Sequence, residues 1–147
     1  MKIALLSDIH ANLPAFDACL EHARAHGAQQ FALLGDLVGY GADPGPVLDR
    51  AMQLAAAGAL CVRGNHDAAA LAPPAVAQNL GDQSAQWTHP HLDERQRGFL
   101  AGLPLTERLG PDALLVHASA DGPERWHYIT DSNAAERCMT AATRIDP

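Results

Sequence analysis

The sequence is poor in basic residues and in long apolar runs, and each shortage excludes a class of protein. Lys and Arg together number 10 against 17 Asp and Glu, which gives a formal net charge of −7 at pH 7. A nucleic-acid-binding surface needs clustered Lys and Arg, so we expect none here. The apolar run in "MKIALLSDIH" is too short for a signal peptide and far short of the ~20 residues that span a bilayer. We therefore expect a cytoplasmic protein with no membrane partner.

Cysteine is also scarce. Cys19, Cys61 and Cys138 lie far apart, are odd in number and form no C-x-x-C pair. This pattern indicates neither a disulfide framework nor a thiolate zinc site, and it fits a reducing compartment. What the chain does contain is eight histidines in an acidic background, a composition that suits a cation-binding protein.

Short apolar runs alternate with segments of helical periodicity in the first half, which is typical of parallel β-α-β units. The predicted strands are 2–7, 31–35 and 59–64, and the predicted helices between them are 12–26 and 46–57. Asn12 is the expected N-cap of the first helix, and Gly27 its stop signal.

In the second half the pattern predicts helices at 76–88, 92–102 and 133–143, and strands at 105–109 and 112–116. Gly110-Pro111 indicates a tight antiparallel connection between these two strands, and Asn133 with Glu136 is a variant capping pair for the last helix. No linker or internal repeat interrupts the pattern. With 147 residues, 48% of them hydrophobic, we expect residues 1–147 to form a single domain.

Four of the five predicted strands are followed by polar side chains that suit a metal ion. The four groups are Asp8 with His10, Asp36, Asn65-His66-Asp67, and His117. Because ligands bind at the carboxyl ends of the strands in open α/β sheets, we expect these side chains to converge. Taken singly, each has a structural interpretation: a helix cap for Asp8, an Asx-turn for Asp36 and a partly buried strand-end histidine for His117.

The ligand types indicate which metal ions would bind. Asp8 and His10 can face one cation where the chain leaves its strand and no longer alternates strictly. Carboxylate, imidazole and amide oxygen without thiolate suit Mn, Fe, Zn, Ni or Mg. A bridging carboxylate such as Asp36 would allow two ions ~3.5–4 Å apart.

Four segments in this order, "SDIHAN", "GDLVGYG", "GNHD" and "LLVHAS", resemble the calcineurin-like metallophosphoesterase superfamily, specifically its compact bacterial and archaeal branch of small phosphodiesterases. The resemblance runs from residue 3 to about residue 140. It implies a mixed α/β (α+β) fold, the metallo-dependent phosphatase-like β-sandwich flanked by helices, with a site for two divalent metals, manganese foremost.

The resemblance also implies roles for the residues. Asp8 and His10 would hold the first metal, Asn65 and His117 the second, and Asp36 would bridge both. The two ions would activate a hydroxide that attacks phosphorus, and His66 would act as the catalytic acid on the leaving group.

Three further residues receive weaker assignments. Asp67 is expected to support the site or cap a helix rather than bind metal. Arg63 is either a phosphate contact or a solvated strand-end charge, and Tyr40, with Asp43, is a candidate for the lining of a substrate cleft.

Two departures from the family pattern matter. Gly39 and Tyr40 stand where the phosphoprotein-phosphatase branch has an aspartate and an arginine, which disfavours a protein phosphatase. The Gly-His-x-His motif that closes the family pattern, with one ligand for each metal, is absent. We expect a chain truncated before this motif, with its C-terminal part missing; the alternatives are ligands from a second copy or from His127. The apolar neighbours of His127, which are Trp126, Tyr128 and Ile129, favour core packing for that segment.

The function predicted from these motifs is a metal-dependent phosphoester hydrolase, a phosphodiesterase or phosphatase acting on a small phosphoester. The alternative is a catalytically impaired or inactive binding or scaffold form of the same fold. A shortened second sheet would leave unpaired edges, so we also expect homo-oligomers or poor solubility.

Overall fold

Three short parallel strands organise the first half of the chain. β1 (Ile3–Leu6), β2 (Gln30–Leu33) and β3 (Leu60–Cys61) pair in the order β1-β2-β3, connected by α1 (Leu13–Ala25) and α2 (Pro44–Ala56). The structure is a computed structural model and describes residues 1–145. The predicted β-α-β order is confirmed, but every strand ends earlier than expected because its last predicted residues form site loops instead.

The first helix begins and ends where the sequence predicts. Asn12 is its N-cap and accepts a hydrogen bond from the Ala15 N–H at 3.1 Å, which satisfies one of the unpaired donors of the first turn. Gly27 follows the helix with φ +78°, a left-handed conformation that favours glycine. α1 buries Phe16 and Leu20.

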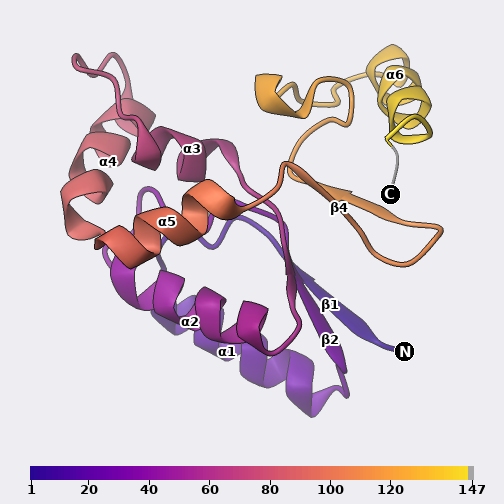
Figure 1. Cartoon of the computed structure of the whole chain (residues 1–147), viewed down its shortest axis with the longest axis horizontal. Helices are drawn as coiled ribbons and strands as arrows, with labels where there is room; N and C mark the ends of the chain where they lie inside the picture. Colours follow the sequence, from indigo (N-terminus) through magenta and orange to yellow (C-terminus); the bar gives the residue numbers. More distant parts are fainter. Residues whose placement is uncertain (146–147) are drawn as a thin grey trace.

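Successive residues of β2 face opposite sides of the parallel sheet. Leu33 packs in the larger core with α1 and α2, whereas Ala32 packs with Val62 and with Leu115 of β5. This alternation follows from the two-residue period of a strand. In Figure 1, α1, α2 and the helices within residues 65–102 lie on one side of the parallel strands, and the hairpin of residues 106–116 and the last helix lie on the other.

The second half adds four helices and the hairpin. Their bounds are α3 (Asn65–Leu71), α4 (Leu80–Thr88), α5 (Glu94–Gly102), β4 (Thr106–Arg108), β5 (Leu114–Val116) and α6 (Ser132–Ala142). Short 3-10 turns cover His89–His91 and Pro123–Arg125. β4 and β5 are antiparallel, as predicted, and the mixed α/β fold class is confirmed. Among residues 1–145, no helix is long and apolar enough to cross a membrane.

One helix has no counterpart among the predicted elements, and one predicted cap was wrong. α3 has no periodic helical pattern, because its first three residues are polar and alanines follow without periodicity. The last helix is capped by Asp131, not by the Asn133–Glu136 pair. Asp131 has an extended backbone, and its side chain accepts from the Ala134 N–H at 2.7 Å.

Candidate metal centre

The loops that follow β1 and β2 have an unusual backbone. Six non-glycine residues among those described have positive φ, and three of them are the predicted ligands Asp8 (φ 56°), His10 (φ 49°) and Asp36 (φ 52°). Such left-handed residues are uncommon outside glycine and cluster at functional sites. This backbone lets side chains two residues apart share one direction, as predicted for Asp8 and His10.

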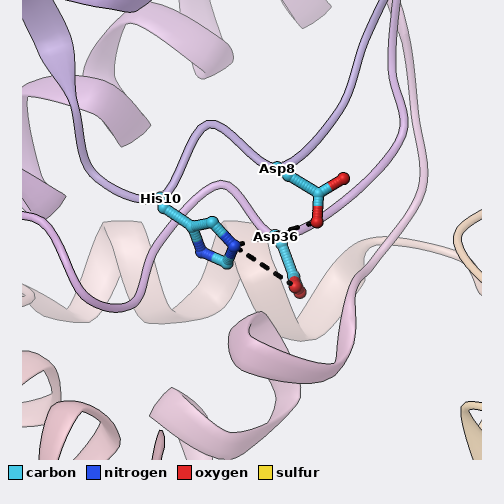
Figure 2. Close-up of side chains that lie close together, drawn as sticks. All are labelled: Asp8, His10 and Asp36. Atoms are coloured by element: carbon cyan, nitrogen blue, oxygen red, sulfur yellow. Dashed lines mark ion pairs between the residues drawn. The ribbon is translucent and has the colours of Figure 1, made fainter.

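These three residues form a compact group at the end of the sheet (Figure 2). The Nε2 of His10 lies 3.8 Å from Oδ1 of Asp8 and 3.9 Å from Oδ2 of Asp36. One ligand atom from each residue lies within 4.8 Å of the others. Two carboxylates and an imidazole at this separation could hold one divalent ion.

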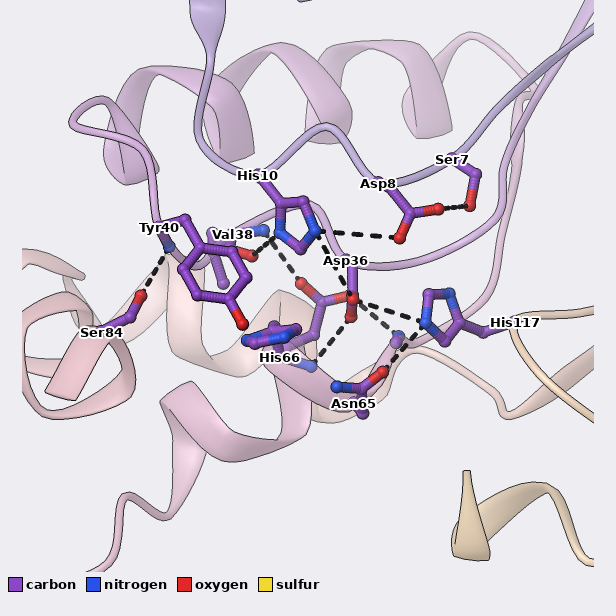
Figure 3. A network of polar contacts seen from close by, with 12 residues as sticks. Ser7, Asp8, His10, Asp36, Val38, Tyr40, Asn65, His66, Ser84 and His117 are labelled. Atoms are coloured by element: carbon purple, nitrogen blue, oxygen red, sulfur yellow. Dashed lines mark hydrogen bonds and ion pairs between the residues drawn. The ribbon is translucent and has the colours of Figure 1, made fainter. Parts of the chain in front are cut away.

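Asp36 faces a second group on its other side (Figure 3). Its Oδ2 lies 3.4 Å from Nε2 of His117, and the same nitrogen lies 3.1 Å from Oδ1 of Asn65. Oδ2 of Asp36 therefore faces both His10 and His117. The structure brings together all five predicted ligands, which come from three loops and the first turn of α3.

Backbone carbonyls orient both imidazoles. The Nδ1 of His117 lies 2.7 Å from the carbonyl oxygen of Leu34, and the Nδ1 of His10 lies 3.3 Å from that of Val38. Because a carbonyl can only accept, each Nδ1 is the donor, and each Nε2 is turned toward Asp36. A metal-binding histidine commonly has this arrangement, with its other nitrogen fixed by a hydrogen bond.

The electrostatics of the centre favour a cation. Burial alone would raise the pKa of Asp36, but the hydrogen bond and charge of His117 outweigh it and hold that pKa below its usual value. In return, the hydrogen bond to Asp36 raises the pKa of His117 to about 9, against the opposing effect of burial. A buried carboxylate whose ion-pair partners among the described residues are histidines fits a divalent cation between those groups.

Close packing of two loops positions Asp36. A Cβ at Gly64 would lie 2.1 Å from Oδ1 of Asp36, and a Cβ at Gly35 would lie 2.6 Å from the Gly64 nitrogen. Glycine at both positions lets the β2 and β3 loops come into contact. The glycine that ends the predicted third strand is thus the N-cap of α3, and it places Asn65 and His66 in the first turn.

His66 lies beside the carboxylate that both groups share. Its backbone N–H donates to Oδ1 of Asp36 at 2.8 Å. Its ring lies 5.1 Å from that of His10 and 4.5 Å from that of Tyr40, between ring centroids. Burial is the largest influence on the pKa of His66 and lowers it. The imidazole is therefore close to the centre and outside the group formed by Asp8, His10 and Asp36.

Asp67 ties the two loops together. It is fully buried, and its two oxygens accept from the N–H groups of Gly64 at 2.9 Å and Val38 at 3.1 Å. Burial raises its pKa to about 7. This contact pattern agrees with the predicted supporting and capping role.

The other weakly assigned residues occupy different surroundings. Tyr40 lines a cavity of about 550 Å³ together with Asp43, Asp8 and His10. Arg63 instead donates from Nη1 to the carbonyl of Ala101 in α5 at 3.4 Å, so its predicted phosphate contact stays a prediction.

The segment around His127 differs from the sequence expectation. Its neighbours Tyr128 and Ile129 were expected to pack in the core, but they are 81% and 46% exposed. Trp126 has φ 55° and places its ring 6.1 Å from that of His117. Together they line a second cavity, of about 230 Å³, beside Asp8, Asn65 and His117. His127 itself is exposed and is not among the residues that line this cavity.

Sequence reasoning missed the carbonyls of Leu34 and Val38 and the aromatic lining of the second cavity. Every residue has a backbone carbonyl, so the pattern of side chains cannot indicate which carbonyls contact a histidine. The aromatic segment had a detectable signal, since Trp126 and Tyr128 closely follow a strand-end histidine, but their apolar rings favoured a core assignment.

The fold and the donor set define a candidate divalent-metal centre at the carboxyl edge of an α/β sheet. Comparison with known proteins identifies the family: a model of the calcineurin-like phosphoesterase family matches residues 1–139, and the chain belongs to this family. The predicted family resemblance is confirmed.

Three known proteins illustrate the similarity. The uncharacterized protein MJ0912 of Methanocaldococcus jannaschii is 34% identical over 132 residues, which cover 86% of this chain and 53% of that protein. A metallophosphoesterase from Sphaerobacter thermophilus superposes with a TM-score of 0.80 at 32% identity, covering 96% of this chain and 56% of that structure. The hypothetical protein PH1004 of Pyrococcus horikoshii shares the fold, with a TM-score of 0.78 at 21% identity over 97% of this chain and 65% of that one. The chain thus spans little more than half the length of the first two.

Proposed function

We propose that this chain hydrolyses phosphoesters with two divalent cations, manganese foremost, bound on either side of Asp36. One observation carries the proposal: Oδ2 of Asp36 faces the Nε2 atoms of both His10 and His117. Asp8 and His10 would hold one ion, and Asn65 and His117 the other. Bound there, two cations neutralise phosphate charge and lower the pKa of a water toward neutrality.

His66 would supply the proton for the leaving group. In hydrolysis the water oxygen forms a new bond to phosphorus, the bond from phosphorus to the leaving oxygen breaks, and that oxygen needs a proton. His66 lies beside the centre, and its lowered pKa makes its protonated form a stronger acid. The water's own proton then restores the imidazolium, so the cycle is balanced.

Removal of the imidazole tests this role. With excess Mn²⁺ and bis(p-nitrophenyl) phosphate, we expect His66→Ala to lower kcat by about 10²–10⁴-fold while bound metal is retained. His22→Asn, on the exposed face of α1, is the control and should keep the parental rate. Equal rates for His66→Ala and the parent would refute the catalytic assignment.

A scaffold without turnover is the competing function. Elemental analysis separates the two: two metal ions per chain together with turnover support the hydrolase. Fewer than two ions and no turnover support the scaffold.

A further inference from the structure

Asp8 lines two cavities that reach the predicted metal ligands His10 and His117. The larger, of about 550 Å³, extends past His10 and Tyr40, and the smaller, of about 230 Å³, extends past His117 to Trp126 and Tyr128. A phosphate at the centre would therefore have space on two sides. A phosphomonoester has one substituent to place, whereas a phosphodiester has two.

Two aromatic side chains line the smaller cavity, the half-buried Trp126 and the exposed Tyr128. Only 5% of the residues are Phe, Trp or Tyr, with two Trp and two Tyr in the chain. Phe16 lies in the core with Phe31 and Phe99 against it, whereas both tyrosines and Trp126 line the two cavities. Tyr128 leaves 81% of its surface exposed, so its ring is free to stack on a ligand.

The charges of the linings restrict the ligand further. Among the described residues, neither cavity is lined by Lys or Arg. A polyphosphate chain would find no cation in them beyond those of the metal centre. The linings therefore favour a ligand whose charge is concentrated on one phosphate, with uncharged groups on both sides.

We propose that the substrate is a phosphodiester with one phosphate and a nucleobase-like planar ring, and that the ring stacks against Tyr128 and Trp126 in the smaller cavity. This inference rests on the proposed hydrolase function and specifies its substrate class. Stacking of a base on an aromatic side chain is sequence-tolerant, because every base offers a π-face. The second substituent occupies the larger cavity beside His66 and leaves with the proton.

Two substrates with the same leaving group test the proposal. Thymidine 5′-(p-nitrophenyl phosphate) and methyl p-nitrophenyl phosphate both release p-nitrophenol. They differ only in the group that stays on the phosphate, so the ratio of their kcat/KM values measures the contribution of thymidine relative to methyl. We expect the full chain with Mn²⁺ to prefer the thymidine ester, and Tyr128→Ala to lower this ratio about tenfold. Tyr128→Phe keeps the ring and should keep the ratio. Trp87→Ala removes an exposed aromatic of α4 and should change neither rate.

A proportional loss on both substrates in Tyr128→Ala, or no preference in the parent, would overturn the proposal. A binding measurement covers the case in which neither ester is hydrolysed, which would refute the hydrolase function itself. In a Trp87→Phe background Trp126 is the sole tryptophan, and thymidine monophosphate should quench its fluorescence at lower concentration than methyl phosphate does. Equal concentration dependence for the two ligands would overturn the stacking assignment independently of turnover.

Discussion

The Oδ2 of Asp36 lies 3.4 Å from the Nε2 of His117, a contact between the loop after β2 and the end of β5. Asp36→Asn keeps an oxygen for the His66 N–H and suits the left-handed backbone, since Asn tolerates φ > 0. It replaces the shared negative oxygen with an amide. We therefore expect two bound Mn²⁺ per chain in the parent and loss of both in Asp36→Asn, measured by elemental analysis after dialysis. Asp43→Asn, at the N-cap of α2, should retain two ions; retention of two in Asp36→Asn would contradict the bridging role.

The pKa of His117 predicts a pH-dependent stability for the metal-free chain. An unfolded histidine loses its proton near pH 6.5, whereas His117 in the fold holds it to about pH 9 because of Asp36. The His117–Asp36 pair therefore stabilises the fold fully below pH 6.5, and this contribution declines as the pH rises to about 9. In EDTA, the free energy of unfolding of the parent minus that of His117→Gln should fall between pH 6.5 and 9. A difference that is constant over this interval would count against a charged pair.

Gly64→Ala should damage the centre through steric overlap. The φ of Gly64 is −96°, so alanine suits the backbone, but its Cβ would lie 2.1 Å from Oδ1 of Asp36. We expect a loss of about 1–3 kcal/mol in the free energy of unfolding, measured with urea, together with weaker metal binding.

Gly98→Ala is the matched control. A Cβ at Gly98 meets nothing within 4 Å, and the residue lies in α5. Alanine there should be neutral or stabilise by up to ~1 kcal/mol. Similar destabilisation in both variants would show that the loss of a glycine itself, rather than steric overlap at Gly64, lowers the free energy of unfolding.

Asp67→Asn should loosen the connection between the two loops. Both oxygens of Asp67 accept backbone N–H groups, and asparagine can satisfy only one of them. At pH 8 we expect a loss of about 1–3 kcal/mol in unfolding free energy. Asp112→Asn, on an exposed turn residue, should change it little. Equal stability of the parent and Asp67→Asn would show that the loops do not depend on this carboxylate.

Much of the site could be predicted from the sequence because strand-end position is a topological property. Once three runs are identified as parallel strands, Asp8, Asp36 and Asn65 must lie at one edge of the sheet. The hairpin then adds His117 to the same group. The helix boundaries followed from caps such as Asn12, whose side-chain geometry is local.

What could not be predicted depends on contacts between distant segments. The helix that begins at Asn65 has little propensity signal of its own. It is held by long-range hydrogen bonds from the His66 N–H to Asp36 and from the Val38 N–H to Asp67. Likewise, the exposure of Tyr128 depends on what packs over it, which no local pattern encodes. The roles assigned to the five ligands and to His66 remain predictions until metal binding and turnover are measured.

The left-handed backbone of the β1 loop also indicates where the protein can be stabilised without loss of ligands. Asp8 and His10 carry donor atoms, so the torsional cost of their conformation cannot be removed by substitution. Ala11 has the same left-handed backbone, with φ 52°, but contributes no donor. Glycine adopts this conformation readily, but Ala11 is fully buried, so Ala11→Gly would stabilise the loop only as far as the relief of torsional strain exceeds the loss of a packed methyl group.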